Sequence, residues 1–123
     1  GTRGYMGVSL SALMGARLLM EEPVGEVYFS YYLLFDGPFQ FLLEGDIKQE
    51  ESRFEKTPLL STKVYLTSAS PGNREHVIKF KQRYQSRGYE GLHLIYKEFD
   101  VQHSDIAAPS YEYFLNELFE GKL

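Results

Sequence analysis

Hydrophobic and polar positions along this chain follow two alternating patterns, one typical of strands and one typical of helices. Short apolar runs that end in serine, aspartate, glycine or proline favour buried β-strands. Between them, apolar residues recur every three or four positions, as on the buried side of an amphipathic helix. The pattern predicts strands near residues 4–8, 26–34, 63–67 and 92–98. It predicts helices over residues 10–20, 74–86 and 109–119, with a shorter helix between residues 39 and 54.

Strands separated by helices of this length predict an α/β fold, in which crossover helices connect the strands of a parallel sheet. Residues 1–123 contain no internal repeat and no linker, so we expect a single domain. Four strands are few for a parallel sheet, which normally has both faces covered. The edge of the first strand would therefore be open, and we expect self-association or a partner that completes the sheet.

Composition and charge narrow the classes of partner. The 123 residues are 43% hydrophobic, enough for one core, and the formal net charge is −4. The densest group of basic residues, in the helix at 74–86, alternates with apolar positions and is typical of a solvated helix side, so we expect no nucleic-acid partner. No apolar run approaches the about 20 residues of a membrane span, so we expect no membrane partner. The absence of cysteine excludes disulfides and thiolate chemistry, and it leaves the compartment open.

The first candidate for chemistry is Ser9, which lies between a predicted strand and a predicted helix. A nucleophile elbow needs this position and small residues two before and two after the serine, because the turn brings strand and helix close together. Gly7 meets that demand and Ser11 meets it approximately. The turn would also direct the backbone N–H of Leu10 toward a developing oxyanion. The alternative is that Ser9 only caps the N-terminus of the helix.

The second candidate is His103, in the loop that follows the last predicted strand. The carboxyl ends of parallel strands meet at one edge of the sheet, so a histidine there can reach a serine at the same edge. The other two histidines fit structural positions. His93 falls within a strand pattern, and His76 falls at the start of a helix.

A hydrolase triad also needs a carboxylate that fixes the tautomer of the histidine. In the chain order nucleophile, acid, base, the acid lies between Ser9 and His103, ideally after the third strand. Glu75 fits this position, although glutamate is also favoured there by the helix N-terminus alone. Asp100, close to His103 in sequence, is the alternative acid.

Several segments resemble the putative esterase family that includes esterase D and the Fes-type enterobactin esterases. The stretch 3–16 is similar to the family's G-x-S-[LM]-G-G elbow and the helix after it, which here ends before Pro23. The segment 88–92 resembles a recurrent short motif of the family, and Pro109 with Tyr111 match the start of its last helix. Two departures are clear: Ser11 and Ala12 stand where the family has glycines, and its N-terminal half has no counterpart before Gly1.

The resemblance implies the C-terminal half of an α/β-hydrolase and the chemistry of a carboxylic-ester hydrolase. Ser9 would attack the ester carbonyl of a small molecule and His103 would take its proton, without cofactor or metal. Leu10 would be the one identifiable oxyanion donor, since the loop that supplies the second belongs to the missing half. The competing interpretation is a non-catalytic, truncated hydrolase fold that serves as a dimerisation or binding module.

Overall fold

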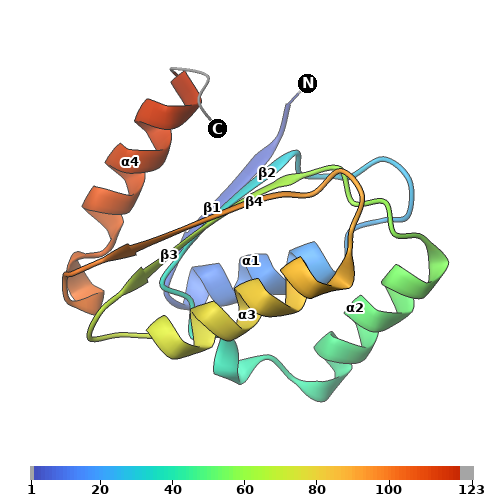
Figure 1. Ribbon diagram of the computed structural model, residues 1–123, viewed down its shortest axis with the longest axis horizontal. Coiled ribbons are helices and arrows are strands. Elements are labelled where there is room, and N and C mark those ends of the chain that lie inside the picture. The colour runs from blue at the N-terminus through green and yellow to red at the C-terminus, as the bar shows by residue number, and fades with distance from the viewer. Residues whose placement is uncertain (1, 120–123) are drawn as a thin grey trace.

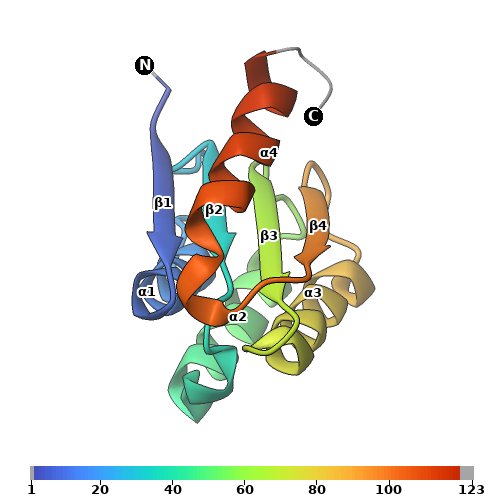
Figure 2. The ribbon, with the colours of Figure 1, turned by 90° about the vertical axis from the view of Figure 1, so that its left-hand side faces the viewer.

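A four-stranded parallel sheet forms the centre of the computed structural model, which describes residues 2–119. The strands are β1 (Gly4–Val8), β2 (Tyr31–Phe35), β3 (Lys63–Ala69) and β4 (His93–Phe99), and they lie side by side in chain order (Figure 2). Every neighbouring pair is parallel. The predicted α/β architecture with crossover helices is therefore confirmed.

The helices lie on both faces of the sheet (Figure 1). The elements α1 (Leu10–Met20), α2 (Glu44–Lys56) and α3 (Arg74–Arg87) lie on one side, and α4 (Ala107–Phe119) crosses the other. Two short 3₁₀ turns, η1 (Phe39–Phe41) and η2 (His103–Asp105), complete the order. Gly88 ends α3 with a left-handed φ of 79°, as a C-cap glycine does. Among the described residues, no helix is both long and apolar enough to cross a bilayer.

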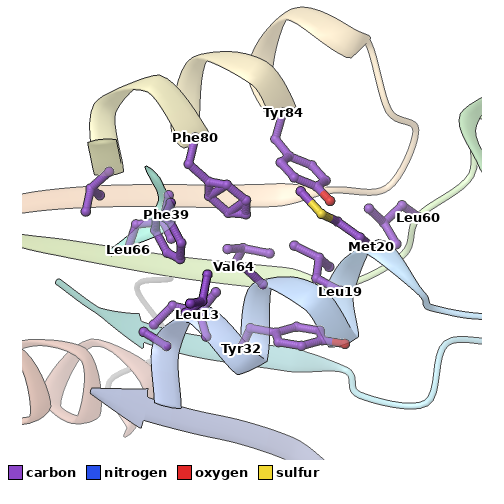
Figure 3. Packing of buried hydrophobic residues seen from close by; sticks show 14 residues of the cluster. Leu13, Leu19, Met20, Tyr32, Phe39, Leu60, Val64, Leu66, Phe80 and Tyr84 are labelled. Atoms are coloured by element: carbon purple, nitrogen blue, oxygen red, sulfur yellow. The ribbon is translucent and has the colours of Figure 1, made fainter. Parts of the chain in front are cut away.

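The larger part of the core lies between the sheet and the pair α1 and α3 (Figure 3). Leu13 and Leu19 of α1 and Leu66 of β3 belong to this cluster, and Phe80 and Tyr84 of α3 cover it. On the opposite face, a smaller cluster of Leu33, Phe35, Tyr65 and Phe114 holds α4 against the strands. Both faces of β2 and β3 are buried, and β2 is a continuous apolar and aromatic run, as is typical of a central parallel strand. In β3 the apolar residues 64–66 are followed by the buried polar residues Thr67 and Ser68.

The second strand begins later than the sequence pattern predicts, at Tyr31 rather than near residue 26. The buried carboxylate of Glu22 accepts hydrogen bonds from the backbone N–H groups of Tyr28 (2.7 Å) and Phe29 (3.0 Å). The same carboxylate also accepts from the hydroxyl of Tyr32. These amides are therefore used by a side chain instead of a neighbouring strand, and the β-branched and aromatic residues before Ser30 pack as a loop.

Strand β1 forms one edge of the sheet, and its side toward α4 is open. The Met6 side chain on it is 51% exposed. A groove of about 620 Å³ runs there between β1 and α4, lined among others by Met6, Val8, Tyr111 and Leu115. An uncharged edge strand beside an apolar groove is the kind of surface that pairs with another polypeptide. The predicted association through this edge stays a prediction.

Candidate active site

Three polar side chains from distant parts of the chain meet at the carboxyl edge of the sheet. Ser9 directly follows β1, Asp36 directly follows β2, and His103 follows β4 in the turn η2. The strand arrowheads in Figure 2 all point to this edge, where α1 begins and the chain enters α4. Because the strands are parallel, residues just after them gather at one side even when they are far apart in sequence.

Ser9 sits in a strained turn between β1 and α1. Its backbone has φ 60° and ψ −120°, a conformation that L residues with a side chain rarely adopt. Its N–H donates to the carbonyl of Phe35 at 3.0 Å, which ties the turn to the end of β2. A Cβ atom on Gly7 would lie 2.4 Å from the backbone oxygen of Ser11, so the approach of helix to strand requires glycine there. The turn therefore has the geometry of a nucleophile elbow.

The Ser9 hydroxyl contacts His103. The distance from Ser9 Oγ to His103 Nε2 is 3.0 Å, and the other ring nitrogen, Nδ1, hydrogen-bonds to Asp36 Oδ2. Ser9 makes no side-chain capping hydrogen bond, so the competing role as a helix cap does not occupy its hydroxyl. Asp36 is fully buried, whereas the His103 side chain is 40% exposed. The three residues thus extend from the fully buried Asp36 to the partly exposed Ser9.

The carboxylate at His103 is neither of those expected from the sequence. Glu75 lies in the first turn of α3, 73% exposed, and pairs with Lys79 at 3.4 Å. Asp100 is exposed in the bend after β4. Asp36 takes the position because β2 is the immediate neighbour of the strand that carries Ser9. The segment Asp36-Gly37-Pro38 has the composition of an ordinary turn. The one sequence signal for a catalytic role of Asp36 is its position directly after a predicted strand.

The loop after β3 does not provide the carboxylate that contacts His103. It provides hydrogen-bond donors to the carboxylate of Asp36. Asp36 Oδ1 accepts hydrogen bonds from the backbone N–H groups of Ala69 (3.0 Å) and Asn73 (3.1 Å). The Asn73 side-chain amide donates to the Asp36 carbonyl at 2.9 Å, and the Asp36 N–H donates to the carbonyl of Thr67 at 2.8 Å. A buried carboxylate is tolerated when donors surround it in this way.

The first turn of α1 presents a backbone donor beside Ser9. Within residues 2–119, the N–H of Leu10 has no hydrogen-bond partner, as the first amide of a helix generally has none inside the helix. The turn is held in place by Tyr5, whose hydroxyl donates to the carbonyl of Ser11 at 2.6 Å. Burial raises the pKa of Tyr5, so the phenol stays neutral and able to donate.

The other histidines lie outside this group. His93 is the first residue of β4, where its ring meets the edge of Tyr65 at 6.4 Å between centroids. His76 lies in the first turn of α3, beside a separate cleft. Across the described part of the chain, no three His, Asp or Glu side chains gather as a metal site would require.

Comparison with known proteins supports the fold. No family model and no curated protein sequence matches the chain. Among solved structures, it is similar to the crystal structure of an IroE-like serine hydrolase from Shewanella oneidensis, with a TM-score of 0.72 and 19% sequence identity. The match covers 98% of this chain and 40% of the other, so the chain spans well under half the length of that hydrolase. At this identity, the likeness shows a hydrolase-like α/β fold.

Proposed function

We propose that this chain carries the catalytic triad of a serine hydrolase that cleaves carboxylic esters, with Ser9 as nucleophile, His103 as base and Asp36 as acid. The observation that carries the proposal is the continuous contact from Ser9 Oγ through the His103 ring to the buried Asp36. The strained elbow at Ser9 supports it, because strain of this kind persists where the surrounding structure maintains it and is common at active sites. The named function of the structural neighbour, a serine hydrolase, agrees with it.

Acylation follows from the position of each atom. Ser9 Oγ attacks the ester carbonyl while its proton passes to His103 Nε2, 3.0 Å away. Asp36, held at Nδ1, keeps the imidazole in the tautomer whose Nε2 is free to accept and stabilises the imidazolium that forms. The negative charge moves to the carbonyl oxygen, where the N–H of Leu10, which is unpaired among the described residues, can donate to it.

The tetrahedral intermediate then collapses, and His103 returns the proton to the leaving alcohol. Water then attacks the acyl group on Ser9 while His103 Nε2 takes a proton from it. When the bond to Ser9 Oγ breaks, His103 returns that proton to Oγ, which releases the acid and restores the enzyme. One oxyanion donor is assigned in this chain. Removing one donor has cost about 10²–10³ in rate in other hydrolases, so we expect slow turnover from residues 1–123 alone.

The test uses a fluorophosphonate probe, which labels an activated serine, together with hydrolysis of p-nitrophenyl acetate. Ser9→Ala should abolish both signals, and Asp36→Asn should reduce turnover by about 10⁴, as loss of the acid does in other triads. Glu75→Gln and Asp100→Asn are the matched controls and should retain activity within about twofold. Labelling that persists in Ser9→Ala, or an equal loss in Asp36→Asn and Glu75→Gln, would contradict the proposed triad.

A second candidate function is a non-catalytic pairing module. The observation that favours it is the open edge of β1, where Met6 is half exposed beside the apolar groove under α4. The fluorophosphonate probe distinguishes the two functions, because a non-catalytic pairing module would self-associate but would not react with the probe.

A further inference from the structure

We infer that Asn73 is a positioning residue for Asp36: its amide and its backbone N–H together orient the carboxylate toward His103. The inference rests on the triad proposed above and assigns a role to a residue outside it. Asn73 touches Asp36 at two points, since its N–H donates to Oδ1 at 3.1 Å and its side chain donates to the backbone carbonyl at 2.9 Å.

The capping behaviour of Asn73 indicates that its side chain serves the acid. Asn73 is the N-cap residue of α3, where asparagine normally accepts a hydrogen bond from the first turn of its own helix. Here the side chain makes no capping hydrogen bond and is turned to Asp36 instead. The Asn73 side chain therefore does not cap its own helix and instead hydrogen-bonds to Asp36, which lies in the loop after β2.

The burial and backbone conformation of Asp36 explain why it needs these contacts with Asn73, which together are called the Asn73 clamp. Asp36 has a positive φ of 47°, which is uncommon for a residue other than glycine but is tolerated by aspartate, and it is fully buried. Donors from Ala69 and Asn73 occupy Oδ1 and leave Oδ2 for the histidine. With the carbonyl held by Asn73 as well, both the backbone and the carboxylate of Asp36 are fixed.

The loop between β3 and α3 fits closely around this arrangement. A Cβ atom on Gly72 would lie 2.5 Å from Asp36 Oδ2, so only glycine lets the loop pass the carboxylate. On its far side, Asn73 Oδ1 meets the exposed Gln40 amide at 3.5 Å, a long contact. The short contacts of the Asn73 side chain and N–H are those to Asp36.

Asn73→Ser separates positioning from capping. Serine is as good an N-cap residue as asparagine, but its hydroxyl is too short to reach the Asp36 carbonyl. We expect kcat to fall about tenfold with KM within about twofold while the chain still unfolds cooperatively; a loss of this size accompanies removal of the residues that orient the ligands of metal sites. Asn73→Asp, which sets a carboxylate against Asp36, should lose more. Gln40→Ala is the matched control and should keep kcat.

A spectroscopic readout makes the test independent of turnover. The ring ¹⁵N shifts of His103, assigned with His103→Gln, report which ring nitrogen carries the proton. In the unmutated protein they should show the Nδ1–H tautomer, and Asn73→Ser should shift them toward the mixture seen in Asp36→Asn. If the unmutated chain shows no Ser9-dependent hydrolysis, the proposed function fails while this readout still tests the clamp. Unchanged ring shifts and unchanged kcat in Asn73→Ser would overturn the inference.

Discussion

Glu50 provides the sharpest test of how the structure is held together. It lies on α2, a helix with few apolar residues, and its side chain is only 1% exposed. Its carboxylate accepts two hydrogen bonds from Arg87 at 2.8 Å, one from Tyr89 at 2.5 Å and one from Arg83 at 3.3 Å. This one residue therefore links α2 to the end of α3 and to the segment that leads into β4.

Glu50→Gln preserves shape but removes the charge that these donors surround. Hydrogen bonds to charged groups contribute about 1.5–3 kcal/mol each, and breaking a buried pair costs about 3–5 kcal/mol. Arg83 and Arg87 are 35% and 26% exposed and can turn to water, which reduces the loss. We therefore expect a loss of about 2–3 kcal/mol from a typical total of about 5–15 kcal/mol. Thermal unfolding followed by circular dichroism should show a Tm lower by about 8–12 °C.

The pH dependence gives an independent check with a definite sign. Burial raises the pKa of Glu50, but hydrogen bonds from Arg87 and Tyr89 and the charge of Arg87 lower it more, so the net pKa lies below its usual value. A lowered pKa adds stability above the unfolded value of about 4.3, and that stability disappears as the pH falls through the folded pKa. The difference between the unmutated chain and Glu50→Gln should thus be full at neutral pH and shrink below about pH 4.

Glu44→Gln on the same helix is the control. Glu44 is 82% exposed and pairs with Lys48 at 3.1 Å, an arrangement worth about 0.3–0.5 kcal/mol at most. If Glu50→Gln unfolds at the same temperature as Glu44→Gln, or if its deficit does not depend on pH, the account of Glu50 is wrong.

Three further predictions concern the elbow and the open edge. Ser9→Gly should be more stable than Ser9→Ala by about 1 kcal/mol in urea unfolding, because glycine relieves the positive φ; equal midpoints would argue against strain. Gly7→Ala should cost about 1–3 kcal/mol by overpacking against Ser11, measured in the same way, and a neutral result would contradict the tight turn. Sedimentation at micromolar concentration should show an associated species that Met6→Lys dissociates, whereas a compact monomer of the unmutated chain would count against pairing through β1.

The alternation of strand and helix patterns was sufficient to predict the architecture. Residues buried on one side of a strand or a helix recur at a fixed spacing, and this spacing of apolar residues is visible in the sequence. The positions of β1, β3 and β4 follow from short apolar runs and the turn residues after them. The same logic brings Ser9 and His103 to one edge, since both follow strands of a parallel sheet. Their 3.0 Å separation is a property of the folded chain that no spacing rule provides.

The tertiary structure decided which carboxylate meets the histidine and where the second strand starts. Glu75 and Asp36 both follow strands and both suit the chain order, but only the strand order places β2 beside β1 and turns Asp36 inward. Likewise, the Glu22 carboxylate accepts hydrogen bonds from the N–H groups of Tyr28 and Phe29, so this segment forms a loop although its composition favours a strand. Local pattern encodes which face of an element is buried, whereas the pairing of two polar groups depends on how distant elements lie against each other, and that is determined only when the chain packs.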